Sequence, residues 1–203
     1  MNVDRVVSFP SSVCVEERVT VVKKLIADFL NPTTEDSVRL ECEEIFAHLL
    51  DDPDVRVRQA LAHGLAFSDN SPRALIWGLI QDIPDVSGVL FRHSSFLHNS
   101  HLHHALQSGN SEIQEAIAAR GTLDKTIVQS LAKMGCAQSI VCLLNNRSVV
   151  LGQGLLYDIA ERLGDDANVR HALLEVAGLS MESRQLLVQK TCDAITSHLG
   201  SKG

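Results

Sequence analysis

Aromatic residues are scarce in this sequence of 203 residues. One tryptophan, one tyrosine and six phenylalanines make up 4% of the chain, whereas hydrophobic residues as a whole make up 45%. Aliphatic side chains must therefore fill most of the core, which suits thin helices that pack closely. Such a high apolar fraction excludes a disordered chain. The length suits one domain, residues 1–203, with a continuous core.

Positive charge is also in short supply. The formal net charge is −7, and lysine and arginine occur singly or in pairs such as Lys23-Lys24. Nucleic-acid affinity depends largely on basic groups that displace counterions from phosphates. An acidic chain without a basic cluster therefore argues against a nucleic-acid partner.

The sequence lacks any Cys-x-x-Cys pair. Its cysteines are odd in number, and each lies in an apolar helical context: Cys14, Cys42, Cys136, Cys142 and Cys192. Buried free thiols are the simplest interpretation, and they favour a reducing compartment.

Membrane and export signals are missing as well. The chain has no stretch of eighteen apolar residues that could span a bilayer. The segment Met1–Val7 carries an early acidic residue and no apolar core of signal-peptide length. We therefore expect a cytoplasmic protein with no membrane partner.

No strand-like alternation competes with a helical repeat. A short pattern, Val or Ile followed three and four positions later by apolar residues, begins at residues 57, 86, 113, 140 and 169, at intervals of 29, 27, 27 and 29. Positions 0, 3 and 4 share one face of a helix. A second apolar helical run follows each copy. Helices this short are marginal alone, so we predict an all-α fold, an α-solenoid of about five short helix pairs stacked in a right-handed superhelix.

The ends of the chain depart from this period. Residues 1–50 contain two longer helical segments, from Val13 to Leu30 and from about Thr34 to Leu50, separated by Asn31-Pro32. We interpret residues 1–50 as a helical N-terminal cap, residues 51–178 as the helix pairs and residues 179–203 as a C-terminal capping helix. A cap should present a polar outer surface to solvent.

Two segments resemble HEAT-type repeats, in which an acidic turn is followed by Val-Arg and a helix of small apolar residues. They are Asp51–Leu65, with the sequence DDPDVRVRQALAHGL, and Asp165–Leu173, with the sequence DDANVRHAL. The resemblance implies a HEAT-like α-solenoid.

Roughly two thirds of the chain, ending at about Lys190, is also similar to one uncharacterised bacterial family of unknown function with HEAT-like repeats, found mostly in alphaproteobacteria. The similarity is carried by Val89-Leu90, Ser94–Leu97, Ala116–Arg120, Leu123, Val141–Asn146 and Leu179-Ser180. Ser95 departs from the proline usual in that family. These motifs are structural, so the resemblance implies a fold and no catalytic residues.

Histidines cluster in one segment: His93, His98, His101, His103 and His104. On a helix beginning near Asn99, His101 and His104 are three residues apart and share a face, and His98 precedes them closely. One hypothesis is a metal site formed by His98, His101 and His104, although no carboxylate or cysteine in the segment completes the ligand set. The alternatives are a solvated helix start, or a pH-sensitive partner contact.

Arg58 and Arg170 occupy matched repeat positions, with Asp54 and Asp166 nearby. They form either an anion site or, as we expect, ion pairs with acids in the adjacent turn that join neighbouring repeats. The aromatic residues at apolar helical positions are expected in the core: Phe46, Phe67, Trp77 and Phe91.

No catalytic constellation is visible, and no cofactor is implied. The leading hypothesis is a non-enzymatic protein-interaction, scaffold or regulatory module, because solenoids often present the second helix of each pair to a partner protein. The residues expected on that face are His101, His104, Lys125, Gln129, Gln153 and Tyr157. The alternative is a HEAT-like enzyme, or a metal-dependent regulator that uses the His98–His104 segment.

Overall fold

The computed structural model describes residues 14–200, with side chains up to residue 196, and this part of the chain is entirely helical. The expectations for Met1–Val7 and Val13 lie outside it. The helices are α1 (Val15–Leu30), α2 (Asp36–Leu49), α3 (Val55–Leu65), α4 (Arg73–Ile80), α5 (Pro84–His93), α6 (Asn99–Gln107), α7 (Ser111–Ala118), α8 (Lys125–Met134), α9 (Ala137–Asn145), α10 (Gln153–Leu163), α11 (Ala167–Glu175) and α12 (Met181–Gly200).

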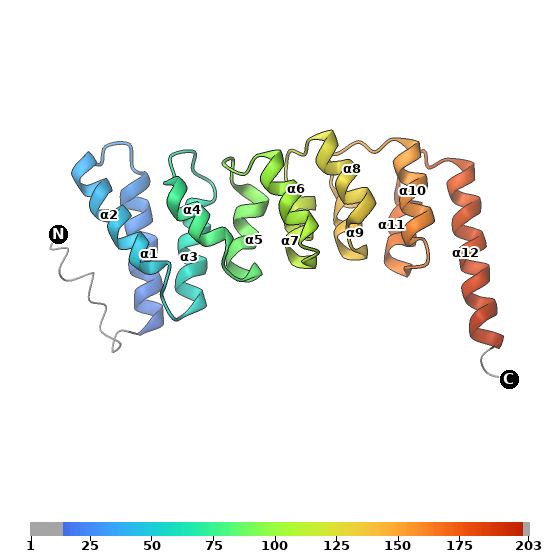
Figure 1. The fold of residues 1–203 in the computed structure, drawn as a ribbon, viewed down its shortest axis with the longest axis horizontal. Coiled ribbons are helices and arrows are strands. Elements are labelled where there is room, and N and C mark those ends of the chain that lie inside the picture. Colours follow the sequence, from blue (N-terminus) through green and yellow to red (C-terminus); the bar gives the residue numbers. More distant parts are fainter. Residues whose placement is uncertain (1–13, 201–203) are drawn as a thin grey trace. The chain divides into compact units, whose positions relative to one another are not determined.

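The chain divides into two compact units, residues 1–98 and 99–203, and we describe each by itself. In the first unit, α3 packs between α1 and α5 (Figure 1). The helices α2 and α4 connect these neighbours and contact them from one side. That the whole chain forms one domain stays a prediction.

The second unit consists of two layers of helices. The helices α7, α9 and α11 contact one another in succession, and so do α6, α8, α10 and α12 (Figure 1). Contacts between α6 and α7, α8 and α9, and α10 and α11 join the two layers. Each helix therefore buries one face against its layer neighbours and another against the opposite layer.

The repeat predicted from the sequence coincides with the odd-numbered helices α3, α5, α7, α9 and α11. Its first positions are all buried, with exposed fractions of 6% or less: Val57, Val86, Ile113, Ile140 and Val169. The periodicity therefore identified the helices whose apolar side chains form the cores of the two units.

Short polar side chains start several of these helices. Asp54, Asn110, Asp124 and Asp166 each accept a hydrogen bond from a backbone N–H in the first turn that follows, which satisfies a donor that has no partner inside the helix. The turn after α6 ends at Gly109, whose φ of +73° favours glycine.

Two serines that precede helices do not cap them. Ser71 does not cap α4, because its hydroxyl donates to the carbonyl of Leu65 at 2.7 Å and so caps the end of α3. The tenth helix begins at Gln153 and not near Ser148. Gly152 is its N-cap residue, so the Gly152-Gln153-Gly154 segment starts a helix instead of interrupting one.

Buried amides connect successive helices of the second unit. Gln114 on α7 is 2% exposed; it donates to the carbonyl of Leu106 at 3.2 Å and accepts from the N–H of Cys136 at 2.8 Å. Asn146, after α9, donates to the carbonyls of Ala118 and Arg120, both at 2.8 Å. Each amide thus satisfies helix-end groups that would otherwise lose their hydrogen bonds to water.

The two matched arginines behave differently. Arg58 forms a two-pronged ion pair with Asp82, with distances of 2.6 and 3.1 Å, and so ties α3 to the turn before α5, as expected. Arg170 instead donates to the carbonyls of Gly164 and Asp165 at the end of α10. Arg58 also donates to the carbonyl of Asp52, six residues earlier, at 2.6 Å, just as Arg170 does to that of Gly164. Both arginines therefore bind the turn before their own helix, and Arg58 adds a carboxylate from the turn before α5.

The cysteines are free, but they are not uniformly buried. Cys42 is buried, Cys136 and Cys142 are half-buried, and Cys14 and Cys192 are exposed. The expectation that all five lie in the core is therefore wrong for the two near the ends of the described chain. Burial raises the pKa of the Cys42 thiol.

Candidate binding surfaces

The six residues predicted to face a partner lie on successive helices of one layer. His101 and His104 are on α6, Lys125 and Gln129 on α8, and Gln153 and Tyr157 on α10, and these three helices contact one another in order. All but the half-buried His101 are exposed. The second unit therefore brings residues separated by more than fifty positions in the sequence onto one helical layer.

An open hollow of about 400 Å³ lies on the surface of this layer, between residues of α6 and α8. It is lined by Asn99, Ser100, His103, His104, Gln107, Thr126 and Ile127. Ile127 is only 1% exposed and supplies an apolar base, whereas the other side chains are polar. The hollow suits a polar side chain or loop of another molecule better than it suits an enclosed small ligand.

Gln153 has a structural role that the sequence did not indicate. Its amide donates to the carbonyl of Gly178 at 3.0 Å and accepts from the N–H of Ser180 at 3.0 Å. Both groups belong to the turn between α11 and α12, so Gln153 holds the start of α12 against α10. Its polar atoms are engaged inside the chain, which leaves Lys125, Gln129 and Tyr157 as the more available side chains of the predicted face.

The histidines predicted to bind metal do not form a ligand set. Over residues 14–196, no group of three His, Cys, Asp or Glu side chains is arranged to hold a metal ion. His98 is the last residue of the first unit, and His101 and His104 belong to the second. The metal hypothesis therefore stays a prediction without a preformed site.

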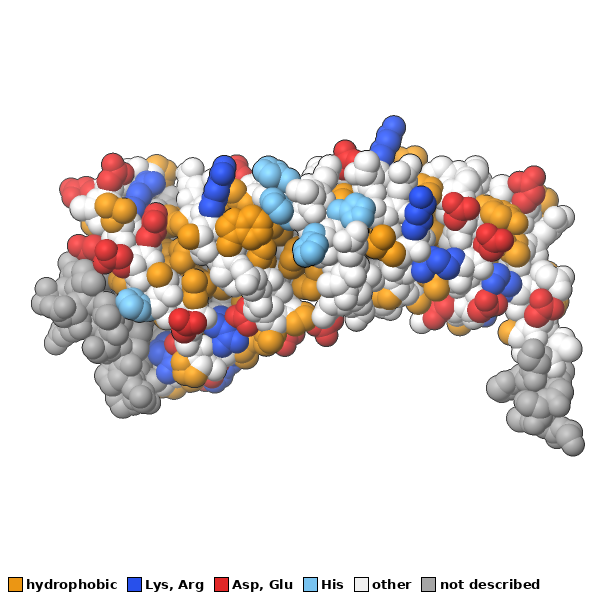
Figure 2. Space-filling view, in the orientation of Figure 1, with side chains coloured by type: hydrophobic (Ala, Val, Ile, Leu, Met, Phe, Trp, Pro, Cys, Tyr) orange, Lys and Arg blue, Asp and Glu red, His pale blue; other side chains and the backbone are white. Residues whose placement is uncertain are grey.

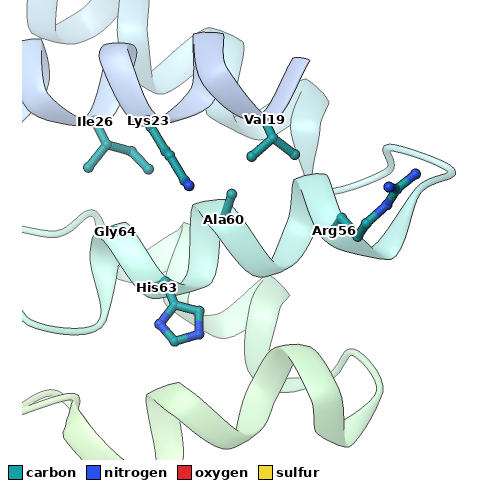
Figure 3. Close-up of a pocket in the computed structure, with 7 residues that line it drawn as sticks. All are labelled: Val19, Lys23, Ile26, Arg56, Ala60, His63 and Gly64. Carbon is teal, nitrogen blue, oxygen red and sulfur yellow. The ribbon is translucent and has the colours of Figure 1, made fainter. Parts of the chain in front are cut away.

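A second hollow, of about 450 Å³, lies between α1 and α3 in the first unit (Figure 3). Its lining includes three basic residues, Lys23, Arg56 and His63, which would suit an anion if they converged. Figure 3 shows that they do not: Lys23 points from α1 toward α3, whereas His63 points from α3 away from α1. Arg56 is engaged by Asp54 and Glu16, each at 3.0 Å. This hollow therefore lacks the geometry of an anion site.

The most exposed aromatic residues lie elsewhere in the first unit, where α3 ends, α4 begins and α5 ends. The ring of Phe67 stacks on that of His93, with centroids 4.3 Å apart and planes tilted by 37°. The guanidinium of Arg73 lies 5.4 Å from the centroid of Phe96, within the range of a cation–π contact. These side chains support one another in fixed positions at the surface.

Trp77 extends this surface along α4. It lies four residues after Arg73 and therefore on the same face of the helix, and it is 42% exposed, while Phe67 is 66% exposed. Figure 2 shows hydrophobic side chains gathered over α4 and α5, with histidine side chains beside them. We call Phe67, Arg73, Trp77, His93 and Phe96 the aromatic surface.

The expectation that Phe67 and Trp77 belong to the core is therefore wrong, whereas Phe46 and Phe91 are buried at 0% and 6% exposure. The eight residues of α4 are RALIWGLI, and only Leu75, Ile76 and Leu79 are buried. A helix that is apolar on every side must expose part of itself unless neighbours surround it. That all-round apolar character was the signal in the sequence for this surface.

Residues 86–203 match the model of a family described as "Uncharacterised protein conserved in bacteria (DUF2336)". The chain belongs to this bacterial family. No curated protein matches the chain, and no solved structure matches it.

The DUF2336 segment begins in α5 and contains all of α6 through α12. The hollow between α6 and α8 and the six predicted partner-facing residues therefore lie inside it. The aromatic surface lies across its start, because Phe67, Arg73 and Trp77 precede residue 86, whereas His93 and Phe96 follow it.

Proposed function

We propose that this DUF2336 protein is a non-enzymatic, cytoplasmic interaction or scaffold module with a HEAT-like α-solenoid fold, and that it binds another protein through the aromatic surface. The observation that carries this proposal is the exposure of Phe67 and Trp77, at 66% and 42%, beside a stacked arginine and histidine.

The composition of the aromatic surface supports a protein partner. Tryptophan, tyrosine and arginine dominate the binding energy of protein–protein interfaces, and aromatic residues are enriched at their centres. Exposed aromatic side chains keep apolar surface in water, which is unfavourable in free energy. A partner that covers them removes this surface from water, and the gain in free energy favours binding. The stacking of Phe67 on His93 fixes the ring in advance, which reduces the entropy lost on association.

Other features favour an interaction module over an enzyme or a nucleic-acid binder. Both hollows are open. The basic residues of the hollow between α1 and α3 do not converge, and the only titratable residues that line the hollow between α6 and α8 are His103 and His104. The net charge of −7 opposes binding to phosphate backbones. In proteins with stacked helix pairs, exposed faces of successive helices form extended protein-binding surfaces.

The HEAT-like assignment is supported by the recurrence of one local design. An acidic turn caps a helix whose Val-x-x-small-apolar face is buried, as at Asp54 with Val57 and at Asp166 with Val169. In each unit the helices that carry the buried Val or Ile of the repeat contact the next such helix in line. A right-handed superhelix of the whole chain is the architecture that we propose from this recurrence.

A photo-crosslinking amino acid at position 77 of the full chain, expressed in the bacterial host, tests the proposal. We expect one specific crosslinked protein from position 77 and none from position 134, because Met134 is similarly exposed, at 40%, but lies on α8 outside the aromatic surface. The crosslinked protein is then purified and its affinity measured by calorimetry. We expect the double variant Phe67→Ser, Trp77→Ala to bind it at least tenfold more weakly.

The predicted face on α6, α8 and α10 is the competing binding site, and a second variant tests it. If the triple variant His104→Ala, Gln129→Ala, Tyr157→Ala loses affinity while the aromatic variant keeps it, the partner binds the second unit and the aromatic surface is not the site. Unchanged melting temperatures of both variants show that the loss is one of contact and not of folding. If neither variant changes the affinity, both assignments are wrong.

A further inference from the structure

The last helix presents a second apolar face that nothing in its own unit covers. The side of α12 that packs on α10 contains Ser183 and Leu187, at 0% and 1% exposure. On the other side, Met181, Val188 and Ile195 are 70%, 62% and 56% exposed. A capping helix should be polar on its outer side, so this face departs from the expectation for residues 179–203.

The exposed residues follow the spacing of a coiled-coil seam. Met181, Gln185, Val188, Cys192 and Ile195 are separated by 4, 3, 4 and 3 residues, and all five are exposed. At 100° per residue they fall within a sector of roughly 80° along one side of the helix. Single exposed apolar residues are ordinary, but a row at alternating spacings of three and four is the pattern by which helices interlock.

We infer that this row, which we call the α12 seam, is the interface at which two copies of the chain pair through their last helices, parallel and in register about a two-fold axis. This inference does not depend on the proposed function, because the α12 seam and the aromatic surface lie on different units.

The charge distribution favours a second copy of the same chain as the partner that covers the α12 seam. The protein carries −7 overall, so most of its surface repels another copy. The charged residues of α12 are Glu182, Arg184, Lys190 and Asp193, which sum to zero, and none of them belongs to the α12 seam. Two such helices therefore meet without the repulsion that opposes contact elsewhere.

The polar positions of the seam select the parallel arrangement. Parallel pairing sets Gln185 opposite Gln185 of the second copy, where the two amides hydrogen-bond to each other, as polar residues do at such positions in parallel coiled coils. Antiparallel pairing of the same five layers would instead place Gln185 against Cys192 of the second copy, whose thiol is only a weak hydrogen-bond partner for the buried amide. At the edges, parallel pairing sets Arg184 beside Gln189, so no like charges meet.

The area is sufficient for a reversible dimer. A helix of twenty residues is about 30 Å long. Two of them paired along five layers bury on the order of 1,200 Å² in total, at the lower end of the range for specific interfaces. We therefore expect a dimer at tens of micromolar protein, and dissociation on dilution.

Light scattering after gel filtration of the full chain, in reducing buffer at about 50 µM, tests the inference. We expect twice the chain mass of 22.2 kDa. Val188→Glu places two carboxylates against each other in the central layer and should yield a monomer at the same concentration. Leu174→Glu, at a similarly exposed apolar position (46%) on α11, should stay dimeric. A monomeric wild-type chain, or a dimeric Val188→Glu variant, overturns the proposal.

A disulfide crosslink tests whether the two α12 helices pair in parallel. Parallel pairing places the two Cys192 thiols opposite each other, so oxidation by diamide, which accepts the two hydrogens, should join them in a disulfide visible on a non-reducing gel. Cys192→Ser should abolish this species but keep the dimer, and Cys14→Ser should leave it intact. A dimer in which Cys192 does not crosslink overturns the parallel arrangement. Circular dichroism of every variant confirms that the helices have formed.

Discussion

At the scale of single residues, polar side chains that bridge helix ends and one glycine determine how closely neighbouring helices approach. Gln114, Asn146 and Gln153 each bridge backbone groups at the ends of other helices. Because folding removes these groups from water, each amide matters more through the groups it satisfies than through its own hydrogen-bond energy. Gly64 allows the close contact between α1 and α3.

Gln114→Leu should lower the free energy of unfolding by about 2–4 kcal/mol, because the carbonyl of Leu106 and the N–H of Cys136 would both lose a partner in a buried place. Urea denaturation followed by circular dichroism measures this change. Gln138→Leu, on the exposed side of α9, is the matched control and should change stability by less than about 0.5 kcal/mol. Equal stabilities of the two variants would refute the role of Gln114.

Gly64→Ala should destabilise the protein by about 1–3 kcal/mol, although alanine favours a helix by about 1 kcal/mol. A Cβ atom at position 64 would lie 2.3 to 3.0 Å from three side-chain atoms of Ile26, which is only 6% exposed and has little room to move. Gly154→Ala, near the start of α10, meets no atom within 4 Å, so we expect it to be neutral or stabilising. Thermal melting of both variants decides whether close packing or helix propensity prevails.

At the scale of helices and turns, the ion pair between Arg58 and Asp82 fastens α3 to the turn before α5. Both side chains are largely buried, with 17% and 15% exposure, so solvent screens the pair less than it screens surface pairs. The Arg58 guanidinium lowers the pKa of the Asp82 carboxyl. Asp82 also accepts from the N–H of Ile83 at 2.7 Å, which fixes the turn.

Asp82→Asn should cost about 1–3 kcal/mol at neutral pH, because Arg58 would keep a charge without its carboxylate partner. The pKa of Asp82 is lower in the folded state than in the unfolded state, where it is about 3.9. The stabilisation is therefore complete above that value and is lost as the pH falls toward the folded pKa. We expect the urea midpoints of wild type and variant to begin to converge below about pH 4 and to meet only once the pH has fallen below the folded pKa of Asp82.

Asp158→Asn, at an exposed site on α10, is the control for this pH series. It should match the wild type in urea midpoint at every pH. If the gap between wild type and Asp82→Asn stays constant down to the lowest pH, the carboxylate is not the source of the stabilisation.

At the scale of the whole molecule, the described side chains form no preformed site for a metal ion. Among the described residues, no helix is both long enough and apolar enough to cross a bilayer. Three surfaces stand out among the described residues: the aromatic surface, the layer formed by α6, α8 and α10, and the α12 seam. The proposals above assign a partner to two of them.

A zinc titration tests the histidine hypothesis for the full chain. We expect no saturable site tighter than about 10 µM by calorimetry, because tight zinc sites need three or four well-placed ligands and no such group exists among the described side chains. A tight site that disappears in the double variant His101→Ala, His104→Ala would show instead that the histidines assemble around the metal.

Local patterns in the sequence determined the helices of this protein and most of its core. The five buried first positions of the repeat, the aspartate caps and the glycine after α6 follow from spacing and side-chain chemistry that act within a few residues. The exposure of His104, Lys125 and Gln129 was predictable for the same reason, since polar side chains opposite a buried stripe face solvent.

Only the tertiary structure decided which apolar side chains stay uncovered and which polar ones are used internally. Trp77 and Val188 occupy apolar helical positions like those of the core yet stay 42% and 62% exposed, whereas Gln153 looked like a surface residue and ties the start of α10 to the turn between α11 and α12. Periodicity reports the direction in which a side chain points relative to its own helix. Burial depends on whether a distant segment lies in that direction, and only the packing of the helices determines that.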